Sequence, residues 1–352
     1  MRKTVIGIVF GGCSTEYEVS LSSAAAVIDH LNGDSYQVIP IGITREGEWY
    51  RYYGDAASIR EDRWRSLPSC IPAVMSTSRD RKGLIELVGT EYRFTALDVV
   101  FPVLHGRNGE DGTLQGLLEL SGIPFVGCGM LSSALCMDKA YAKTIASAAG
   151  IDVAESVTLY PGGSVAEAVG AADKLGYPLY VKPARSGSSI GITKAHDEKE
   201  LQEGIEHALL HDDKIVVERH VDGFEIGCAV LGTSAPFIGE IDEIELTGQF
   251  FDYDQKYTLS ASFIHLPARV DEETSGRAKA AALTVYRALG CSGFARVDFF
   301  LASDGRLLFN EVNTIPGFTS NSRYPNMMRQ AGLPFPELLD RLIASALGEK
   351  RV

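Results

Sequence analysis

The stretch from Gly293 to Ser322 constrains the fold of this chain more than any other part of the sequence. Within it, two apolar runs flank the dipeptide Asp304-Gly305. Asp-Gly favours a tight two-residue turn between antiparallel strands, so the sequence predicts a β-hairpin. Side chains alternate between the two faces of a strand, so every second residue of each run shares a face. The turn therefore fixes which polar residues of the two strands meet.

Four polar residues share one face of the expected hairpin. With the Asp-Gly dipeptide as the turn, Asp298 lies opposite Glu311, and Arg296 lies opposite Asn313. Two carboxylates and a carboxamide oxygen are ligands that Mg²⁺ accepts together with phosphate oxygens. The alternative is a salt-bridged patch on an exposed sheet face. The flanking residues have the composition of buried strands, which favours a metal–phosphate site.

Composition limits the classes of protein to consider. The 352 residues are 45% hydrophobic, enough for two or three packed domains, and the net charge is −13. Because no long basic run is present, we expect neither nucleic acid nor an anionic membrane surface as a partner. Six scattered cysteines without a C-x-x-C pair favour a reduced protein over a disulfide scaffold or a zinc site. No apolar run is long enough to span a bilayer, so a cytoplasmic protein is expected.

The N-terminal part of the sequence predicts a parallel α/β unit. A β-branched run at 4–10 ends in two glycines and is followed by an amphipathic helix, and further strands are expected at 36–43 and 97–104. The last of these leads into a glycine-rich loop that begins with His105. Ligands collect at the carboxyl ends of such strands. His105 and Glu18 are therefore candidate ligand-binding residues, although a structural histidine and a helix-start carboxylate are the alternatives.

Two lysines and a Ser/Gly loop predict phosphate binding in the middle of the chain. Lys139 opens a helix, and Lys182 lies on a strand that leads into R-S-G-S-S-I-G at 185–191. The amides and hydroxyls of this loop can donate to phosphate oxygens, although it is not a Walker A loop. The alternative is a flexible hairpin tip. Glu218 and Glu225 lie on later strands, where they either bind nucleotide hydroxyls and amines or cap the strand ends.

Several motifs in this order make the chain resemble the D-alanine–D-alanine ligases of the ATP-grasp superfamily. The resemblance covers nearly the whole chain and rests on F-G-G-C-S-T-E-Y-E-V-S, H-G-R-N-G-E-D-G-T-L-Q-G, R-S-G-S-S-I-G, R-V-D, N-E-V-N-T and P-G-F-T-S. It implies an α/β (α+β) ATP-grasp fold with an N-terminal parallel-sheet domain at 1–132, a central ATP-grasp subdomain at 133–220 and a C-terminal ATP-grasp domain at 221–352. The aromatic, polar stretch 247–262 is expected to form a lid that excludes water.

The activity that the resemblance implies is the ATP-dependent joining of two D-amino acids for peptidoglycan precursors, through a D-alanyl phosphate. The implied cofactors are ATP and two Mg²⁺ ions, for which Mn²⁺ can substitute, and the expected assembly is a homodimer. The implied metal ligands are Asp298, Glu311 and Asn313. The implied ATP-binding residues are Lys139, Lys182, Ser188, Ser189, Glu218, Glu225 and Lys256. The implied catalytic residues are Glu18, Ser188, Tyr257, Arg296 and Gly317, and the substrate-binding residues are His105, Asp242, Phe251, Ser322 and Arg323.

The resemblance also implies a role for each catalytic residue. Glu18 anchors the ammonium group of the first substrate, and Ser188 and Tyr257 link Glu18 to the lid. Arg296 and the backbone N–H of Gly317 hold the oxygen of the tetrahedral intermediate, where fixed donors give a large rate enhancement.

Substrate choice is expected at other positions. Asp242, Phe251 and Arg323 together resemble the VanG-type D-alanine–D-serine ligases of vancomycin resistance, and the Arg323 guanidinium can orient a hydroxyl directly or through Asp242. Tyr257 stands where D-alanine–D-lactate ligases have a histidine, which favours an amine nucleophile. Ser322 is expected to bind the carboxylate of the second substrate. The near alternative is a housekeeping D-alanine–D-alanine ligase. More distant ones are another ATP-grasp ligase, a carboxylase subunit or a non-catalytic nucleotide-binding module.

Overall fold

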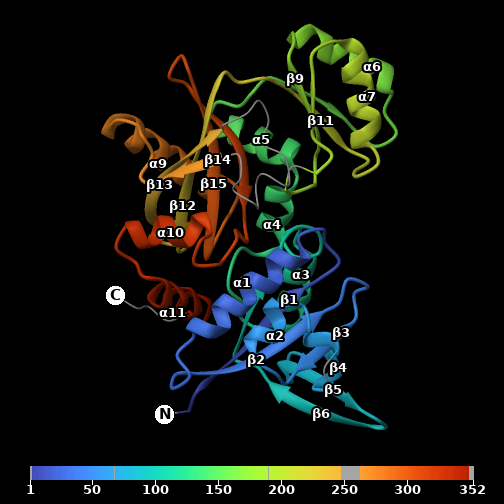
Figure 1. Ribbon diagram of the computed structural model, residues 1–352, viewed down its shortest axis with the longest axis vertical. Coiled ribbons are helices and arrows are strands. Elements are labelled where there is room, and N and C mark those ends of the chain that lie inside the picture. The colour runs from blue at the N-terminus through green and yellow to red at the C-terminus, as the bar shows by residue number, and fades with distance from the viewer. Residues whose placement is uncertain (1, 67, 189, 247–261, 349–352) are drawn as a thin grey trace.

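The computed structural model describes residues 2–66, 68–188, 190–246 and 262–348. In this part of the chain, three β-sheets follow one another along the sequence (Figure 1). Strands between residues 4 and 103 form a seven-stranded sheet, those between 156 and 219 a four-stranded sheet, and those between 223 and 313 a five-stranded sheet. None of the described helices combines the length and the apolar character that crossing a membrane requires.

The N-terminal sheet has a parallel centre and an antiparallel extension. Its order is β6-β5-β4-β3-β2-β1-β7, and β1 lies parallel to both β2 and β7. The expected strands at 4–10, 36–43 and 97–104 are confirmed. The elements of this part are β1 (Thr4–Gly11), α1 (Tyr17–His30), β2 (Tyr36–Ile43), β3 (Trp49–Tyr52), α2 (Ala56–Arg60), a 3₁₀ turn (Trp64–Ser66), β4 (Cys70–Met75), β5 (Gly83–Val88), β6 (Glu91–Ala96), β7 (Val99–Val103) and α3 (Thr113–Ser121).

The central sheet is antiparallel and carries two helices on one face (Figure 1). Its order is β10-β9-β11-β8, and apolar residues of the strands and the two helices form one core. The elements are β8 (Ser156–Leu159), α6 (Val165–Ala172), a 3₁₀ turn (Asp173–Leu175), β9 (Leu179–Pro183), β10 (Thr193–Ala195), α7 (Glu198–Ala208) and β11 (Ile215–Arg219).

The C-terminal sheet has the order β14-β13-β12-β15-β16 and is covered by helices from two parts of the chain. Its elements are α4 (Met130–Met137), α5 (Lys139–Ala148), β12 (Gly223–Leu231), β13 (Phe237–Leu246), β14 (Ser262–His265), α9 (Glu272–Ala288), β15 (Phe294–Ala302), β16 (Leu307–Asn313), α10 (Arg323–Gln330) and α11 (Phe335–Ala346). Ala142 and Ala146 of α5 pack into the core of this sheet together with α9. Helix α5 therefore joins the C-terminal sheet, although its sequence lies within 133–220. The domain boundaries near 132 and 220 stay a prediction.

The hairpin of β15 and β16 has the predicted cross-strand pairs. Asp298 pairs with Glu311, and Arg296 pairs with Asn313. The alternative of an exposed sheet face is wrong, because Arg296 is 8% exposed and Asp298 is 1% exposed.

The predicted two-residue turn is wrong, and a second irregularity compensates for it. The chain closes through three residues, Ser303 to Gly305, and Gly305 has the positive φ of 83° that such loops place at their last residue. This turn alone would shift the pairs by one residue. Asn310 restores the register, because the pairing steps from Phe309 to Glu311 and leaves Asn310 as a β-bulge.

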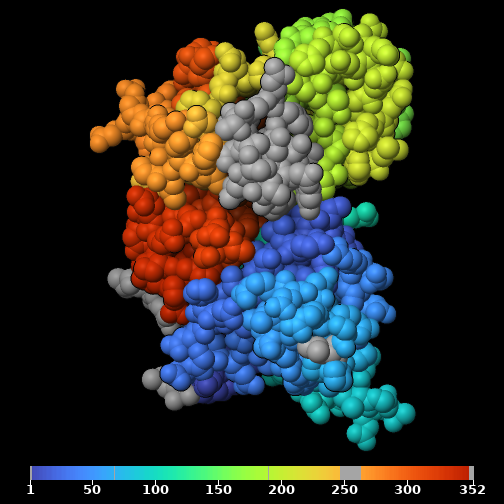
Figure 2. All heavy atoms as spheres, in the orientation of Figure 1, coloured from blue at the N-terminus to red at the C-terminus, as the bar shows by residue number. Residues whose placement is uncertain are grey.

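Helix α11 completes the core of the N-terminal sheet rather than that of its own sheet. Leu338, Leu339 and Leu342 are at most 1% exposed and belong to the cluster that contains Ile6 and Ile8 of β1. Figure 1 shows α11 beside α1, and Figure 2 shows the red C-terminal segment packed directly against the blue N-terminal part. The two ends of the sequence therefore stabilise each other.

We expect Leu342→Ala to lower the free energy of unfolding by about 2–5 kcal/mol, because it leaves a cavity in this shared core. Urea denaturation followed by circular dichroism measures the change. Leu210→Ala is the control. This leucine is 79% exposed, so its substitution is expected to change the free energy of unfolding by less than about 0.5 kcal/mol. Equal stability of the two variants would contradict the packing of α11.

Candidate active site

Two adjoining cavities lie where the three sheets meet. The first has a volume of about 510 Å³ and is called the glutamate cavity; its polar lining includes Glu16, Glu18, His105, Glu110, Ser188, Arg296, Asn313, Ser322 and Arg323. The second has a volume of about 170 Å³ and is called the lysine cavity; its polar lining includes Lys139, Lys182, Ser186, Glu218, Glu225, Asn310 and Glu311. Gly187, Ser188 and Ile244 line both cavities, so the Ser/Gly loop separates them.

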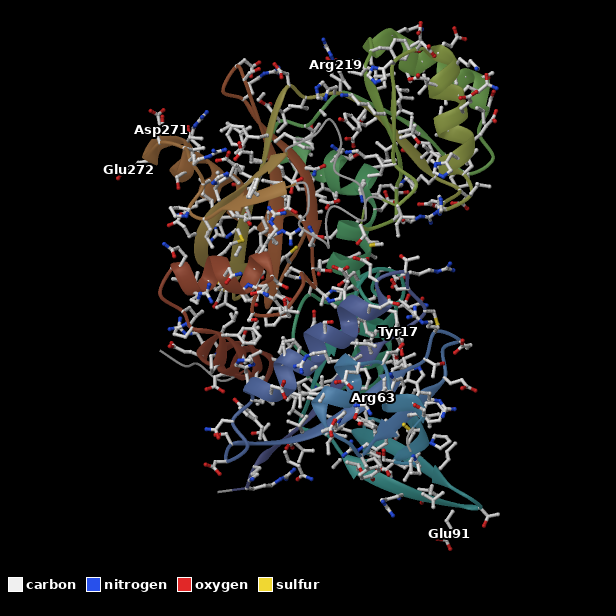
Figure 3. All side chains as sticks on the ribbon, viewed as in Figure 1. Tyr17, Arg63, Glu91, Arg219, Asp271 and Glu272 are labelled. Atoms are coloured by element: carbon white, nitrogen blue, oxygen red, sulfur yellow. The ribbon has the colours of Figure 1, made fainter. Side chains whose placement is uncertain are left out.

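The start of helix α1 places Glu16 in the glutamate cavity. Glu16 is 8% exposed, and the hydroxyl of Ser188 donates a hydrogen bond to its carboxylate. Two glycines make this close approach possible: a β-carbon on Gly106 or Gly187 would lie 2.7 or 2.8 Å from Oε2 of Glu16. Figure 3 labels Tyr17, the first residue of α1, at the end of the helix that faces the other two sheets, whereas Glu91 marks the far tip of the N-terminal sheet.

The predicted link between Ser188 and Glu18 is wrong. The side chain of Glu18 is 64% exposed and forms an ion pair with Arg45 at the outer edge of the cavity. Glu16 is the residue just before α1 and has non-helical backbone angles, whereas Glu18 lies in the first turn of the helix, so the two side chains leave the backbone in different directions. The buried Tyr17 between them anchors the start of the helix. The sequence contains both glutamates in one motif and does not show which of them points inward.

His105 and Glu110 tie the glycine-rich loop to the segment that follows β16. Nδ1 of His105 lies 2.8 Å from the carbonyl oxygen of Ile315, and burial lowers the pKa of this histidine. The carboxylate of Glu110 accepts hydrogen bonds from the backbone N–H groups of Gly106 and Ile315 at 2.8 and 2.9 Å. Burial raises the pKa of Glu110 to about 8, and the negative charge of Glu16 adds to the shift. Glu110 was not predicted as a site residue from the sequence, although the glycine-rich motif that contains it, H-G-R-N-G-E-D-G-T-L-Q-G, supported the family resemblance.

Arg296 and Asp298 on the polar face of the hairpin are buried, Asn313 and Glu311 are half-buried, and the first three of these residues pair with one another. Arg296 donates from Nε and Nη2 to the carboxylate of Asp298 at 2.8 and 2.7 Å, and Nδ2 of Asn313 donates to it at 2.9 Å. Burial opposes the charged form of Arg296, but Asp298 raises its pKa above the ordinary value. Nζ of Lys139 lies 3.3 Å from Oε2 of Glu311. The predicted metal ligands and Arg296 thus share one face of the hairpin, at the boundary of the two cavities.

This face of the hairpin fits a magnesium ion only together with phosphate oxygens. Within the described residues, no three side chains of His, Cys, Asp or Glu are grouped to hold a metal ion. Asp298, Glu311 and Asn313 offer two carboxylates and one amide oxygen, a donor set that suits Mg²⁺ when phosphate and water complete its six positions. The neighbouring cavity is lined by Lys139 and Lys182, whose positive charges suit phosphate oxygens.

The lysine cavity contains a buried cluster of opposite charges. Glu218 lies 2.7 Å from Nζ of Lys182 and 3.1 Å from Nζ of Lys143. Burial alone would raise the pKa of Glu218, but the two lysines outweigh it and lower the pKa to about 2. Lys139 donates to the carbonyl oxygen of Ser186 at 2.8 Å and so contacts the Ser/Gly loop. Sequence reasoning missed Lys143, although its position four residues after Lys139 places both on one helix face.

A buried ion pair holds the first turn of α5 against the central sheet. Asp138 caps the helix by accepting from the backbone N–H groups of Ala140 and Tyr141. The same carboxylate accepts from Nζ of Lys214 at 2.9 Å, and that ammonium lies 3.6 Å from the centre of the Tyr141 ring. Lys139 is the next residue after Asp138, so the ion pair of Asp138 with Lys214 also fixes the backbone position of Lys139.

Arg323 at the start of α10 joins both cavities. Its Nε and Nη2 donate to the two carboxylate oxygens of Asp242 at 2.7 and 2.8 Å, as expected, and its Nη1 donates to Glu225 at 2.9 Å. Ser322 and Gly317 line the same cavity as Arg323. Four predicted site residues lie outside the described residues: Ser189, Phe251, Lys256 and Tyr257.

Comparison with known proteins identifies the class to which this arrangement belongs. The family model of the D-ala D-ala ligase N-terminus matches residues 5–128, and that of the C-terminus matches residues 145–344. A D-alanine–D-alanine ligase of Caldicellulosiruptor bescii is 44% identical over 356 residues, covering 100% of this chain and 97% of the relative. The vancomycin/teicoplanin A-type resistance protein VanA of Enterococcus faecium is also 44% identical, over 99% of each chain.

The crystal structure of the VanG D-Ala:D-Ser ligase from Enterococcus faecalis superimposes with a TM-score of 0.91 at 52% identity, covering 98% of this chain and 100% of that one. The fold is therefore the predicted α/β ATP-grasp fold, and the protein is an ATP-dependent ligase. The chain belongs to the D-alanine–D-alanine ligase family. That family uses ATP and Mg²⁺ in general.

The charge cluster of the lysine cavity predicts how stability depends on pH. The folded pKa of Glu218 lies below the ordinary value of 4.5, so its contribution is full above about pH 4.5 and is lost as the pH falls toward 2. Glu218→Gln is expected to lower the free energy of unfolding at pH 7 by about 3 kcal/mol, because it removes the carboxylate that pairs directly with two buried lysines. The deficit shrinks between pH 4.5 and pH 2.

Urea unfolding at a series of pH values measures this deficit. Glu203→Gln is the matched control, because Glu203 is 64% exposed and pairs with Lys199 at 3.6 Å on the surface of α7. Glu203→Gln is expected to change the free energy of unfolding by less than about 0.5 kcal/mol at every pH. A Glu218→Gln deficit that stays constant down to pH 2 would exclude the depressed pKa.

Proposed function

We propose that this enzyme joins D-alanine to a second D-amino acid and prefers D-serine in the second position. The observation that carries the preference is the guanidinium of Arg323 in the wall of the glutamate cavity, which the fully buried carboxylate of Asp242 holds in place. A fixed guanidinium can donate a hydrogen bond to a substrate hydroxyl. The similarity to the VanG D-Ala:D-Ser ligase supports the same preference. The alternative is a D-alanine–D-alanine ligase, the name that most of the compared relatives carry.

The proposed reaction has two steps. A carboxylate oxygen of D-alanine bonds to the γ-phosphorus of ATP while the bond to ADP breaks, which gives D-alanyl phosphate. The amine of the second amino acid then bonds to the carbonyl carbon, and phosphate leaves as the amine loses a proton. We assign the nucleotide to the lysine cavity, with Lys139 and Lys182 on its phosphates and Glu218 and Glu225 on its adenine and ribose. Both amino acids occupy the glutamate cavity.

The neighbouring side chains suit the charges that develop in these steps. We assign the first ammonium group to Glu16 in place of Glu18, because Glu16 is the carboxylate that lies inward and bonds to Ser188. Arg296 and the N–H of Gly317 are proposed to bind the oxyanion, a role supported by their place in one cavity wall. Ser322 is assigned to the carboxylate of the second substrate. His105 is assigned to a place beside the ammonium group of the first substrate.

Asp298, Glu311 and Asn313 are proposed to hold two Mg²⁺ ions. Bound there, Mg²⁺ neutralises phosphate oxygens and orients the γ-phosphate, and Mn²⁺ can take its place. The lid roles of Phe251, Lys256 and Tyr257 and the phosphate contact of Ser189 stay predictions. So do a homodimeric assembly and a cytoplasmic location, which consumption of ATP for peptidoglycan precursors favours.

The assignment of Glu16 predicts unequal effects of two neighbouring substitutions. Glu16→Gln should lower kcat/KM for D-alanine by about 30-fold or more, because the ammonium group loses its buried counter-charge. Glu18→Gln should change it less than about threefold, since that carboxylate is exposed to water. ADP release with the second substrate saturating measures both. A larger loss for Glu18→Gln would refute the assignment.

The preference for D-serine is tested by direct competition. With equal concentrations of D-serine and D-alanine, the mixed dipeptide should exceed D-alanyl-D-alanine by about tenfold, because the hydroxyl satisfies polar groups that a methyl group leaves unpaired. Arg323→Leu should abolish this excess, and Arg329→Leu, which removes an exposed arginine from the same helix, should keep it. Mass spectrometry of the products gives the ratio. A preference for D-alanine in the unmodified enzyme would favour the alternative function.

A further inference from the structure

The guanidinium of Arg323 occupies a slot that a glycine leaves open in the C-terminal sheet. Gly227 on β12 pairs with Asp242 on β13 and with Asp298 on β15, so the three residues form a row across the sheet. A β-carbon on Gly227 would lie 2.6 Å from Oδ1 of Asp242 and would overlap Nη2 of Arg323. Glycine inside a strand often marks such a close approach. Here Gly227 lets the guanidinium of Arg323 lie over the row, between the carboxylates of Asp242 and Asp298.

From this slot Arg323 reaches a third carboxylate. Glu225 lies two residues before Gly227 on β12, and therefore on the same face of the sheet. Nη1 of Arg323 donates to Oε1 of Glu225 at 2.9 Å, while Nη2 lies 3.6 Å from Oδ1 of Asp298. Arg323 lines the glutamate cavity, and Glu225 lines the lysine cavity. Arg323, whose side chain is 11% exposed, thus lines one cavity and binds a carboxylate of the other.

We propose that Arg323 is a positioning residue for the nucleotide: it fixes Glu225 in the lysine cavity and thereby couples binding in the two cavities. This inference rests on the proposed function, which places the nucleotide in one cavity and the second amino acid in the other. The role differs from the choice between D-serine and D-alanine, because it acts on nucleotide affinity even when no amino acid is bound.

The coupling follows from the rigidity of the guanidinium. Its N–H groups form a planar fork and cannot be aimed independently. Asp242 binds two of them, and Glu225 binds one of the two on Nη1. A second amino acid that accepts from the other Nη1 N–H orders the same group that holds Glu225. By linkage, the nucleotide strengthens binding of that amino acid by the same factor.

Calorimetric titration with ADP, without amino acids and with or without Mg²⁺, tests the positioning role. Arg323→Leu removes the guanidinium, and Gly227→Ala displaces it while keeping every charged group. Both should raise the Kd of ADP about fivefold or more. The increase should persist without Mg²⁺, because the held group is Glu225 rather than a metal ligand. Arg329→Leu, which removes the same charge from the exposed side of α10, should leave the Kd within about twofold.

Coupling is tested by adding D-serine to the same titrations. D-serine should lower the Kd of ADP in the unmodified enzyme and have no effect in Arg323→Leu. Removing Arg323 leaves Asp242 buried without its partner, so folding is checked by thermal unfolding; if that variant does not fold, Gly227→Ala serves in its place.

Three results would overturn the inference: an unchanged Kd in Gly227→Ala, a loss that disappears without Mg²⁺, or an equal loss in Arg329→Leu. A Kd of ADP that does not respond to D-serine in the unmodified enzyme would overturn the coupling. These outcomes are separate from those that test the function. An enzyme that prefers D-alanine can still show the losses in ADP binding, whereas failure of the unmodified enzyme to bind ADP would refute the proposed function itself.

Discussion

The register between β15 and β16 is the constraint on which both cavities depend. It sets Asp298 opposite Glu311 and Arg296 opposite Asn313, so one sheet face carries all four polar groups. A slip of one residue would turn each side chain of a strand to the other face and bury charge in the apolar core. The bulge at Asn310 is therefore part of the site, because it cancels the extra residue in the turn.

Buried carboxylates, each paired with fixed cations, support the walls of the two cavities. Asp298 is held by Arg296, Glu218 by Lys143 and Lys182, and Asp242 by Arg323. Removing such charges from water is costly, and the cost is offset only when each carboxylate has a cation and hydrogen bonds around it. Lys143 and Arg323 reach their carboxylates from helices, whereas Arg296 and Lys182 reach theirs from strands, so the fold sets the positions of the cations before a substrate enters.

The three sheets are joined by segments that pack against a sheet formed by another part of the chain. Helix α11 completes the N-terminal core, and α5 packs against the C-terminal sheet while Asp138 at its start pairs with Lys214 of the central part. Glu110 of the glycine-rich loop accepts from the backbone of Ile315. Each wall of the two cavities is thereby connected to the others through buried contacts, which accounts for a site assembled from all three sheets.

The strands, the polar face of the hairpin, the two leading lysines and the Ser/Gly loop could be predicted from the sequence, because side-chain alternation and turn residues are local signals. Which of two neighbouring glutamates faces the cavity depends on the tertiary structure. It turned Glu16 inward and Glu18 outward, and it brought Arg323 to Glu225 across a slot left by Gly227. Such contacts join residues far apart in the chain. They depend on where a helix begins and on the packing of sheets against one another, which no local pattern records.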